Sequence, residues 1–405
     1  MSASTQMNDV LIVGGGVAGL VLAQGLKHRG IPFRLFERDS HTLSKGYRFR
    51  VVDEGLDALK KTLPPSLWKL FEETAPGTGQ PNILLLNAIT GTKMKYAEIP
   101  NSHSVNFDRR WIRELLSIGI EEHVHFNKAF QQYELLPSDE HNSGGVRVSF
   151  ADGTAVTGRI LIAADGVNSK VRKQFLPDVR LLDVERSVFW GRTLLTPEFQ
   201  ERFNRPDIMA EYLSTLVDPQ TPSHPCLFAP LRWPNNGKLS SLSPKLSDQS
   251  DYMFVTLSFE TPSAELGTEE ARKQFALEIT KTWDPQLKTM FEMAEDTAVH
   301  PIYSSRPDVK VWPTDERITF MGDAIHAMAP TGGSGGYTAV LDAAALTEVI
   351  SQSWNGGDWV KLNDGICDYE KGMRERAKKS IDISFNNGKW LWAGKDWQEY
   401  AEIDR

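Results

Sequence analysis

Residues 317–345 read RITFMGDAIHAMAPTGGSGGYTAVLDAAA, and this stretch decides the fold. Its β-prone, apolar residues Ile318 to Met321 predict a short buried strand. Gly322 and Asp323 end that strand and put a carboxylate at its carboxyl end. Open α/β sheets bind their ligands at this end of the strands, so Asp323 is a candidate ligand contact.

A proline and a group of glycines follow. Pro330 restricts the backbone, and the glycines allow the main chain to approach a flat ligand closely. They are Gly332, Gly333, Gly335 and Gly336. A helix is predicted from about Thr338, with free N–H groups and a positive dipole end in its first turn. Together with Asp323 this arrangement suits a reduced flavin, although an ordinary strand–loop–helix connection is the alternative.

The N-terminal segment carries a second ligand motif. The apolar run Val10 to Val13 leads into GGGVAG, in which Gly14, Gly16 and Gly19 have the dinucleotide-loop spacing. A helix is expected from Leu20 to Leu26. The glycines permit a tight turn, the approach of a pyrophosphate and close packing of helix on strand.

An acidic residue follows at the expected distance. A second predicted strand, Phe33 to Phe36, ends at Glu37, 18 residues after Gly19. An acid about 20 residues beyond the loop holds the adenosine ribose in such folds. Further candidate cofactor contacts are Val17, Ala18 and Arg38. The motif does not separate FAD from NAD.

Two arginine-bearing segments come next. GYRFRVV, residues 46–52, predicts an alternating strand with Arg48 on one face and Tyr47 on the other. For Arg48, a cofactor contact and a solvated edge face both remain open. NFDRRWIRELL, residues 106–116, has helical spacing, and Arg109 at its start is expected to reach a phosphate or the flavin edge. A surface ion pair is the alternative for Arg109.

A third strand also ends in a carboxylate and a glycine. Val146 to Phe150 and Arg159 to Ala164 predict a hairpin whose second strand is apolar, as in a buried parallel sheet. That strand runs into Asp165 and Gly166. We therefore expect three distant segments to form one sheet around one cofactor.

Residues 179–300 change the pattern to antiparallel-looking strands joined by loops rich in Pro, Asn and Ser. A sheet inserted over the cofactor is the natural place for a substrate. In SVFWGRTLL, Trp190 and Arg192 share one face. An arginine among apolar neighbours needs a partner, so Arg192 has either a substrate or catalytic role or a structural ion pair.

The remaining chain is predicted to be helical and holds five of the 11 tryptophans. These indoles are expected to pack the tail onto the body or onto a second subunit. With no secretion signal, Cys226 and Cys367 are expected to be buried thiols of a reducing compartment. His123 and His125 lack further ligands at metal spacing, so no metal site is predicted.

Composition bounds the class of protein. The chain has 405 residues and a formal net charge of −8, and it shows no long basic run, so a nucleic-acid partner is not expected. No apolar stretch approaches the ~18 residues of a membrane span. We expect a cytoplasmic protein with a small-molecule substrate, and the sequence leaves monomer or homodimer open.

Taken together, GGGVAG with Glu37, the strand ending in Asp165-Gly166, and GDAIHAMAP resemble the single-component FAD-dependent monooxygenases of the para-hydroxybenzoate hydroxylase family. The resemblance implies that the glycine loop and Glu37 hold the ADP half of FAD. It implies that Asp165 and Gly166 serve both the flavin and the nicotinamide cofactor. Asp323, next to Gly322, would bind the ribityl chain, and Pro330 would lie beside the oxygen-reacting carbon.

The activity implied is reduction of FAD by NADH or NADPH and reaction with O2 to a flavin C4a-hydroperoxide. This species would hydroxylate or epoxidise an electron-rich aromatic or indole-type small molecule, as in fungal members of secondary metabolism. Arg192 would orient or polarise the substrate, or protonate an oxygenated intermediate. Tyr47 and Pro330 are the other catalytic candidates.

One departure from the family pattern is Tyr337, which stands where Asn is usual after the glycine loop. His326 matches the family and is interpreted as structural. The alternatives are a flavoprotein reductase or desaturase and a non-redox flavin-binding cyclase. A flavin-dependent halogenase is not favoured, because its Trp-x-Trp-x-Ile-Pro motif is absent.

The predicted fold is α/β, with a Rossmann-like FAD-binding domain of discontinuous segments, residues 1–80, 105–178 and 301–350. A mostly antiparallel substrate domain comprises residues 81–104 and 179–300. A C-terminal helical region covers residues 351–405.

Overall fold

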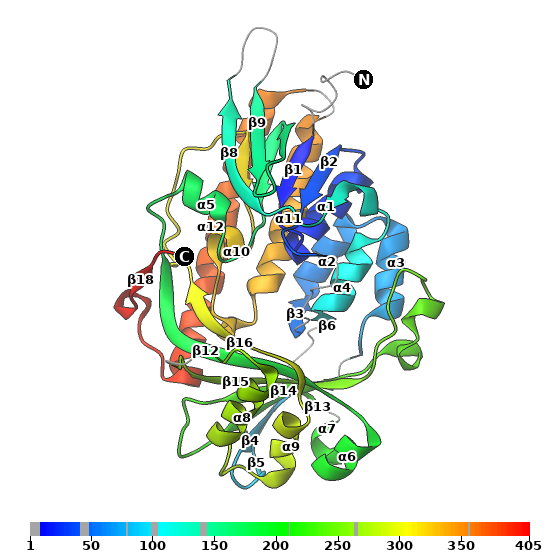
Figure 1. The fold of residues 1–405 in the computed structure, drawn as a ribbon, viewed down its shortest axis with the longest axis vertical. Helices are drawn as coiled ribbons and strands as arrows, with labels where there is room; N and C mark the ends of the chain where they lie inside the picture. The colour runs from blue at the N-terminus through cyan, green and yellow to red at the C-terminus, as the bar shows by residue number, and fades with distance from the viewer. Residues whose placement is uncertain are drawn as a thin grey trace.

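The computed structural model describes residues 9–40, 48–77, 80–98, 104–137, 144–209, 211–262, 266–354 and 357–405. Tyr47, a predicted catalytic residue, lies outside these ranges. Figure 1 shows two parts stacked along the long axis, one built on a parallel sheet and the other on a larger mixed sheet. Strands β12 (Leu181–Leu194) and β16 (Glu295–Ser304) connect the two parts.

The parallel sheet has the strand order β17-β11-β1-β2-β7. Its strands are β1 (Val10–Val13), β2 (Phe33–Phe36), β7 (Val124–His125), β11 (Ile160–Ala163) and β17 (Ile318–Phe320). In register, Ile12 of β1 lies opposite Leu35 on one side and Ile162 on the other. Every residue of β1 and β11 is buried, as expected for a sheet covered on both faces. The prediction that three distant segments form one sheet is confirmed.

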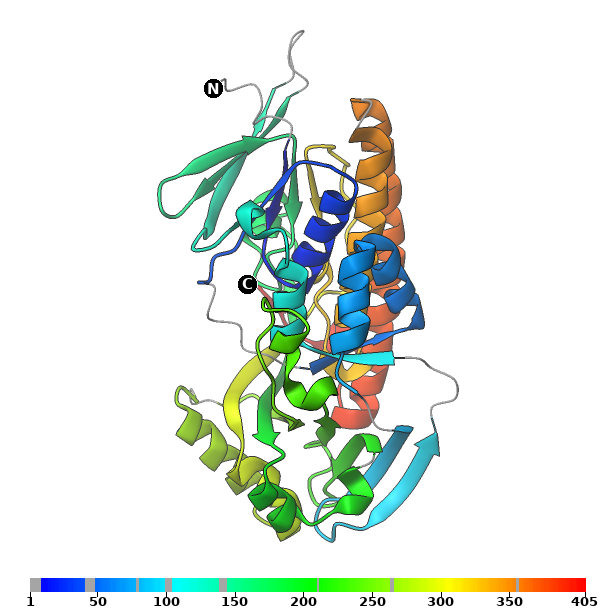
Figure 2. The ribbon, with the colours of Figure 1, turned by 90° about the vertical axis from the view of Figure 1, so that its right-hand side faces the viewer.

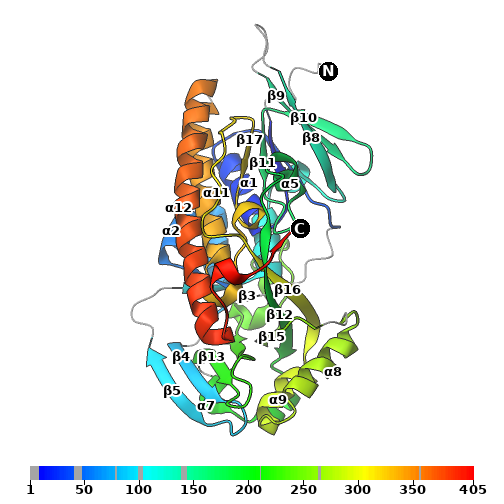
Figure 3. The same cartoon turned by 90° about the vertical axis from the view of Figure 1, so that its left-hand side faces the viewer.

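Helices cover one face of this sheet. They are α1 (Val17–His28), α2 (Asp53–Thr62), α3 (Pro65–Thr74), α4 (Arg109–Ser117), α11 (Gly335–Trp354) and α12 (Trp359–Trp392). Helix α1 is buried from Gly19 to Leu26 because it packs against both β1 and α11. Figures 2 and 3 show α11 and α12 side by side along the body, so the tail is part of the covering layer.

A small antiparallel sheet with the order β10-β9-β8 covers the other side. Its strands are β8 (Phe130–Leu136), β9 (Gly145–Phe150) and β10 (Ala155–Gly158). The predicted hairpin was wrong in its second strand. Strand β9 pairs with β10, and the chain then continues into β11, which leaves the hairpin and joins β1 in parallel. The uniformly apolar run from Ile160 belongs to the sheet that is buried on both faces.

The larger sheet has the order β16-β12-β15-β14-β13-β4-β5, and β18 (Glu402–Ile403) also pairs with β12. Its remaining strands are β4 (Gln80–Asn87), β5 (Lys93–Glu98), β13 (Glu211–Val217), β14 (Cys226–Leu231) and β15 (Tyr252–Glu260). It is mostly antiparallel, but β13 pairs with β4 in parallel. Helices α6 (Pro197–Phe203), α7 (Pro206–Met209), α8 (Glu269–Ile279) and α9 (Pro285–Glu292) lie in the same part.

Four short elements complete the fold. Strands β3 (Arg48–Val52) and β6 (Ser104–Asp108) form an antiparallel pair at the junction, and α5 (Lys170–Phe175) and α10 (Asp323–His326) follow β11 and β17.

Most of the tail indoles pack on the body. Trp359 lies under the guanidinium of Arg159 (4.3 Å), and Trp397 lies under that of Arg306 (5.0 Å), whereas Trp390 is 71% exposed.

Of the two cysteines, Cys226 is buried as predicted, but Cys367 is exposed on α12, so the expectation of two buried thiols was wrong. Across the described ranges, no helix is both long enough and apolar enough to span a bilayer.

Candidate functional site

The glycine loop joins β1 to α1. Gly14 has φ +112°, which L side chains rarely adopt, and a Cβ on Gly19 would collide with the carbonyl oxygen of Gly14. Helix α1 begins at Val17 and Ala18 with no side-chain cap and no acidic residue in its first turn. Its first N–H groups therefore remain available to an anion. A Cβ on Gly16 would meet nothing within 4 Å, so this side of the loop is open.

Glu37 lies at the end of β2, beside the loop. Its Oε2 accepts a hydrogen bond from Gly15 N–H (2.8 Å), and its Oε1 accepts one from Asp39 N–H (3.0 Å). The side chain of Arg113 on α4 comes within 3.7 Å of the same carboxylate. These contacts hold the carboxylate beside the glycine loop.

Two of the arginines predicted as cofactor contacts, Arg38 and Arg109, are exposed in the structure. Arg38 is mostly exposed and pairs with Asp39 (3.3 Å). Arg109 is the exposed first residue of α4, whereas Arg113, one turn later, faces Glu37. Helical spacing put the two arginines on one face, but only the packing of α4 shows which one reaches the carboxylate.

The segment after β11 touches the glycine loop directly. A Cβ on Gly14 would collide with Ala164 O and lie 2.9 Å from the Cα of Asp165. Asp165 Oδ2 accepts a hydrogen bond from Lys170 N–H (2.9 Å) at the start of α5. Its Oδ1 is buried and has no hydrogen-bond partner in the described part of the chain. Burial raises the pKa of Asp165, although hydrogen bonds from the α5 end oppose this. Gly166 has φ +77° and open space where a Cβ would point.

The third segment, after β17, meets the same place. Gly322 has φ 58° and ψ −146°, and a Cβ on it would lie 3.2 Å from Ala339 of α11 and 3.6 Å from Ala18 of α1. Asp323, the first residue of α10, is exposed. The ends of β1, β11 and β17 therefore come together, as the motifs predicted.

The glycine-rich loop ends earlier than expected. Pro330 opens a short 3₁₀ turn and is exposed, and α11 begins at Gly335 instead of near Thr338. Gly333 has φ +61° and open space around it. Gly336 is instead required by the protein itself, because a Cβ there would collide with the ring of Phe49 on β3.

Tyr337 is directed toward α2. Its ring lies against Gly55, where a Cβ would come within 2.7 Å, and its hydroxyl donates a hydrogen bond to Glu54. Burial, followed by the Glu54 contact, raises the pKa of Tyr337. The phenol thus binds the first turn of α11 to α2.

The open spaces and free polar groups at this edge of the sheet fit a dinucleotide cofactor. The loop at Gly16, the turn at Gly166 and the loop at Gly333 each have open space where a side chain would otherwise project. The uncapped start of α1 and the unpartnered Oδ1 of Asp165 are polar groups that a ligand could satisfy. Across the described ranges, no group of three or more His, Cys, Asp or Glu could hold a metal ion.

Arg192 lies on β12, in the larger sheet, next to the parallel-sheet part. Its Nη2 pairs with Asp296 (2.9 Å) and Glu295 (3.3 Å) of β16. Arg110 of α4 donates to the same Asp296 oxygen (2.6 Å). The structural ion pair considered for Arg192 is therefore present, and it reaches across to the helix that carries Arg113.

Aromatic rings surround this arginine. The guanidinium of Arg192 lies 5.9 Å from the ring centre of Tyr252, and that of Arg48 lies 5.7 Å from Phe254. Trp190 packs on Phe254 with ring centres 5.7 Å apart. The buried hydroxyl of Tyr252 donates to Asp108 Oδ2 (2.7 Å), which joins β15 to the start of α4. Two arginines and several rings thus gather where the two parts of the molecule meet.

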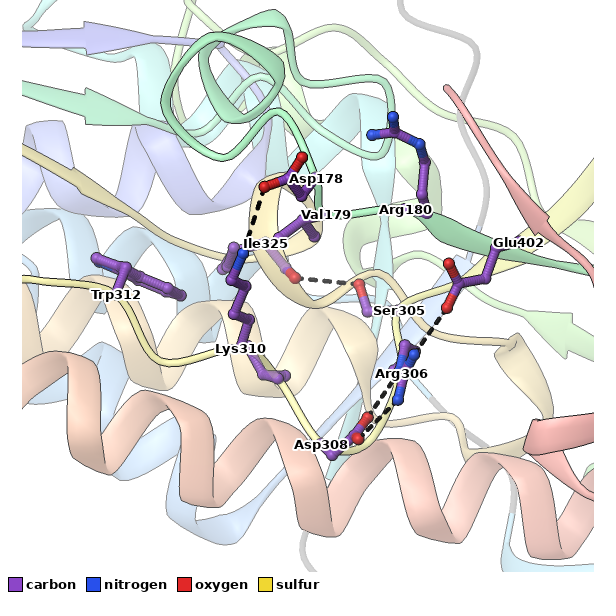
Figure 4. Close-up of a pocket in the computed structure, with 11 residues that line it drawn as sticks. Asp178, Val179, Arg180, Ser305, Arg306, Asp308, Lys310, Trp312, Ile325 and Glu402 are labelled. Carbon is purple, nitrogen blue, oxygen red and sulfur yellow. Dashed lines mark hydrogen bonds and ion pairs between the residues drawn. The ribbon is translucent and has the colours of Figure 1, made fainter.

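A separate pocket of about 310 Å³ lies beside α10, between the chain after β16 and the segment before β12 (Figure 4). Its charged groups are largely satisfied by one another. Arg306 pairs with Asp308 (2.9 Å) and Glu402 (2.7 Å), and Lys310 lies 3.7 Å from Asp178. This pocket contains none of the predicted site residues.

Comparison with known proteins gives a family match. Residues 7–59 and 121–384 match the family described as FAD binding domain. The matched ranges contain the glycine loop, Glu37, Asp165 and the Gly322-Asp323 turn, which converge in the structure.

Curated relatives are fungal proteins. The chain is 32% identical, over its full length, to the dual O-methyltransferase/FAD-dependent monooxygenase CTB3 of Cercospora beticola, and it covers 49% of that protein. It is 26% identical to the FAD-dependent monooxygenase thnD of Trichoderma harzianum, with 93% of this chain and 91% of the relative covered. The chain thus spans about half the length of the first of these relatives.

Solved structures share the fold. A Photorhabdus luminescens protein designated an FAD-containing monooxygenase superposes with a TM-score of 0.77 at 28% identity, covering 95% of this chain and 98% of its own. A salicylate hydroxylase in complex with its substrate superposes with a TM-score of 0.70 at 18% identity, covering 97% and 90%. At that lower identity, the similarity concerns the fold alone.

Proposed function

The chain belongs to the FAD-binding-domain family, and on that premise we propose that it is an FAD-dependent monooxygenase of small molecules. It would use NAD(P)H and O2 to hydroxylate or epoxidise an electron-rich aromatic or indole-type compound of secondary metabolism. The observation that carries the proposal is the convergence of three segments: a Cβ on Gly14 would collide with Ala164 O, and a Cβ on Gly322 would lie 3.6 Å from Ala18.

The proposed cofactor contacts follow from this geometry. The start of α1 would bind the pyrophosphate, Glu37 the adenosine ribose, and Asp323 the ribityl hydroxyls. Bound FAD would carry electrons from NAD(P)H to molecular oxygen. The first turn of α11, at Gly335 and Gly336, would direct its N–H groups toward the negative charge of the reduced ring.

The proposed substrate site is the junction of β12 and β15 with β3. Trp190, Arg48 and Arg192 are partly exposed there, next to the rings of Tyr252 and Phe254. Aromatic side chains suit an aromatic ligand, and guanidinium groups would stabilise a phenolate or orient a carbonyl. The ion pairs of Arg192 with Asp296 and Glu295 would hold its guanidinium in one direction.

The test begins with purified protein reconstituted with FAD. A panel of phenolic and indole compounds is then screened for stimulated NAD(P)H oxidation, matched oxygen consumption and a product heavier by one oxygen atom. Oxidation of NAD(P)H with a changed product but no oxygen uptake would instead identify a reductase or desaturase. Conversion of substrate without any NAD(P)H oxidation would identify a cyclase.

A further inference from the structure

Helix α11 carries a buried carboxylate that the proposed chemistry does not use. Asp342 is 0% exposed, in the middle of the helix. A buried charge is costly unless it is paired and hydrogen-bonded. Its partners therefore indicate what it holds in place.

Asp342 has three donors, and two of them belong to the turn after β17. Its Oδ2 accepts from Gly322 N–H (3.1 Å) and lies 2.5 Å from His326 Nε2. Its Oδ1 accepts from Arg376 of α12 (3.0 Å). The carboxylate thus connects both ends of the Gly322–His326 turn to α11, and α12 supplies a balancing positive charge.

The direction of Asp323 depends on this anchorage. Gly322 has φ 58° and ψ −146°, a conformation that is readily accessible only to glycine, and its carbonyl accepts the N–H groups of Ile325 (3.1 Å) and His326 (3.0 Å). Fixing the Gly322 N–H and the His326 ring fixes both ends of the turn. Asp323 follows Gly322 directly, so its exposed carboxylate takes its direction from the same turn.

We propose that Asp342 is a positioning residue for FAD, acting through the Gly322–His326 turn to direct Asp323 at the ribityl chain. The proposal rests on the proposed role of Asp323 in binding FAD. Asp342 itself is 0% exposed, and its two oxygens are occupied by Gly322, His326 and Arg376. Its effect on FAD is therefore indirect and passes through Asp323.

The test measures FAD affinity of the apoprotein by flavin fluorescence quenching, with circular dichroism and thermal unfolding in parallel. Asp342→Ala is expected to weaken FAD binding about tenfold or more, because the turn loses hydrogen bonds to a charged acceptor. Asp342→Asn keeps one oxygen for Gly322 and His326 and is expected to recover most of the affinity. If only the negative charge of Asp342 supported FAD binding, Asp342→Asn would bind FAD as weakly as Asp342→Ala.

A matched control is Glu370→Gln. Glu370 is also 0% exposed, lies on α12, and accepts hydrogen bonds from Thr319 (2.9 Å) and Thr314 (2.8 Å), neither of which belongs to the Gly322–His326 turn. This variant is expected to lower thermal stability while leaving FAD affinity within about twofold of wild type. This control distinguishes a loss of fold stability from a loss of the position of Asp323.

A double-mutant cycle with Asp323→Ala tests whether Asp342 affects FAD affinity through Asp323. If Asp342 acts through Asp323, Asp342→Ala is expected to add little further loss of FAD affinity in the Asp323→Ala background. Fully additive losses, or wild-type FAD affinity in folded Asp342→Ala, would overturn the proposal. If Asp342→Ala does not fold, His326→Ala, which removes the turn's side-chain contact with Asp342, is taken through the same cycle. No NAD(P)H, oxygen or substrate enters these measurements, so failure of the monooxygenase proposal would be detected separately.

Discussion

The carboxylate of Asp296 lies 2.9 Å from the guanidinium of Arg192 at an irregular point in the pairing of β12 with β16. Asp296 has φ 51°, a left-handed conformation that a non-glycine residue keeps only when its surroundings hold it there. The same carboxylate accepts a hydrogen bond from the guanidinium of Arg110 on α4 (2.6 Å). Burial opposes ionisation of Asp296, but Arg110 and Arg192 outweigh it and lower its pKa. The arginine of the larger sheet is thus connected to a helix of the parallel-sheet part.

Replacing Asp296 tests whether this contact orients Arg192 toward substrate. Asp296→Asn is expected to raise the KM of whichever aromatic compound stimulates NAD(P)H oxidation about tenfold, because a neutral amide holds one guanidinium less firmly than a shared carboxylate. FAD affinity is expected to remain unchanged. Glu292→Gln, which removes a surface partner of Arg202, is the control. An unchanged KM would show that Arg192 does not depend on Asp296.

Glu37→Gln addresses the adenosine end. Glu37 accepts N–H groups on both oxygens, from Gly15 and Asp39, and a glutamine would turn its NH2 toward one of these donors. FAD affinity is expected to fall about tenfold, measured by equilibrium dialysis. Glu348→Gln, at an exposed pair with Arg29 (3.3 Å), is the matched control and is expected to bind FAD normally. Normal affinity in Glu37→Gln would remove this residue from the site.

Tyr337→Phe isolates the hydroxyl that donates to Glu54. Losing one partly exposed hydrogen bond is expected to cost about 0.5–1.5 kcal/mol of unfolding free energy, measured by urea denaturation. The visible spectrum of bound FAD is expected to keep its shape, because the hydroxyl is engaged with α2. Glu54→Gln retains an acceptor and is expected to destabilise less. A clear spectral shift in Tyr337→Phe would show that the hydroxyl reaches the flavin.

The buried His326 and Asp342 pair predicts a pH dependence of stability. Burial lowers the pKa of His326, but the charge and hydrogen bond of Asp342 outweigh it and raise it overall. The stabilisation that protonated His326 gives the folded protein is therefore full below about pH 6.5. It is lost as the pH rises through the pKa of His326 in the folded state. Burial raises the pKa of Asp342, but His326 and Arg376 outweigh it and lower it. The stabilisation from ionised Asp342 is present above about pH 3.9. It is lost as the pH falls through the pKa of Asp342 in the folded state.

Thermal unfolding of wild type and His326→Gln checks this. The difference in Tm is expected to be largest between about pH 4 and 6.5 and to shrink toward pH 9. The control is Asp248→Asn. Asp248 is an exposed carboxylate whose pKa is lowered chiefly by Ser240 and then by Lys238. The Tm difference between wild type and this variant is not expected to shrink toward pH 9. A Tm difference for His326→Gln that stays constant from pH 5 to 9 would contradict the assignment.

Local patterns predicted the strands of the parallel sheet well. The strands ending at Val13, Phe36 and Ala163 were placed from their apolar runs and the glycines or acids that follow them. The parallel sheet could be inferred because buried parallel strands are uniformly apolar, a signal that lies within each segment. The hairpin error at β10 arose because that strand is short and its composition does not differ from a loop.

The partners of the charged residues followed only from the tertiary structure. The sequence contains Arg109, Arg110 and Arg113 in one helix, but only the packing of α4 directs Arg113 to Glu37 and Arg110 to Asp296. The sequence pattern singled out neither Asp342 nor Asp296. The sequence by itself determined the strands, the glycine loop and the acids at the strand ends, because these depend on backbone geometry over a few residues. Tertiary structure alone decided which charges meet, because Arg110 and Asp296 are 186 residues apart and come together only through the stacking of two sheets.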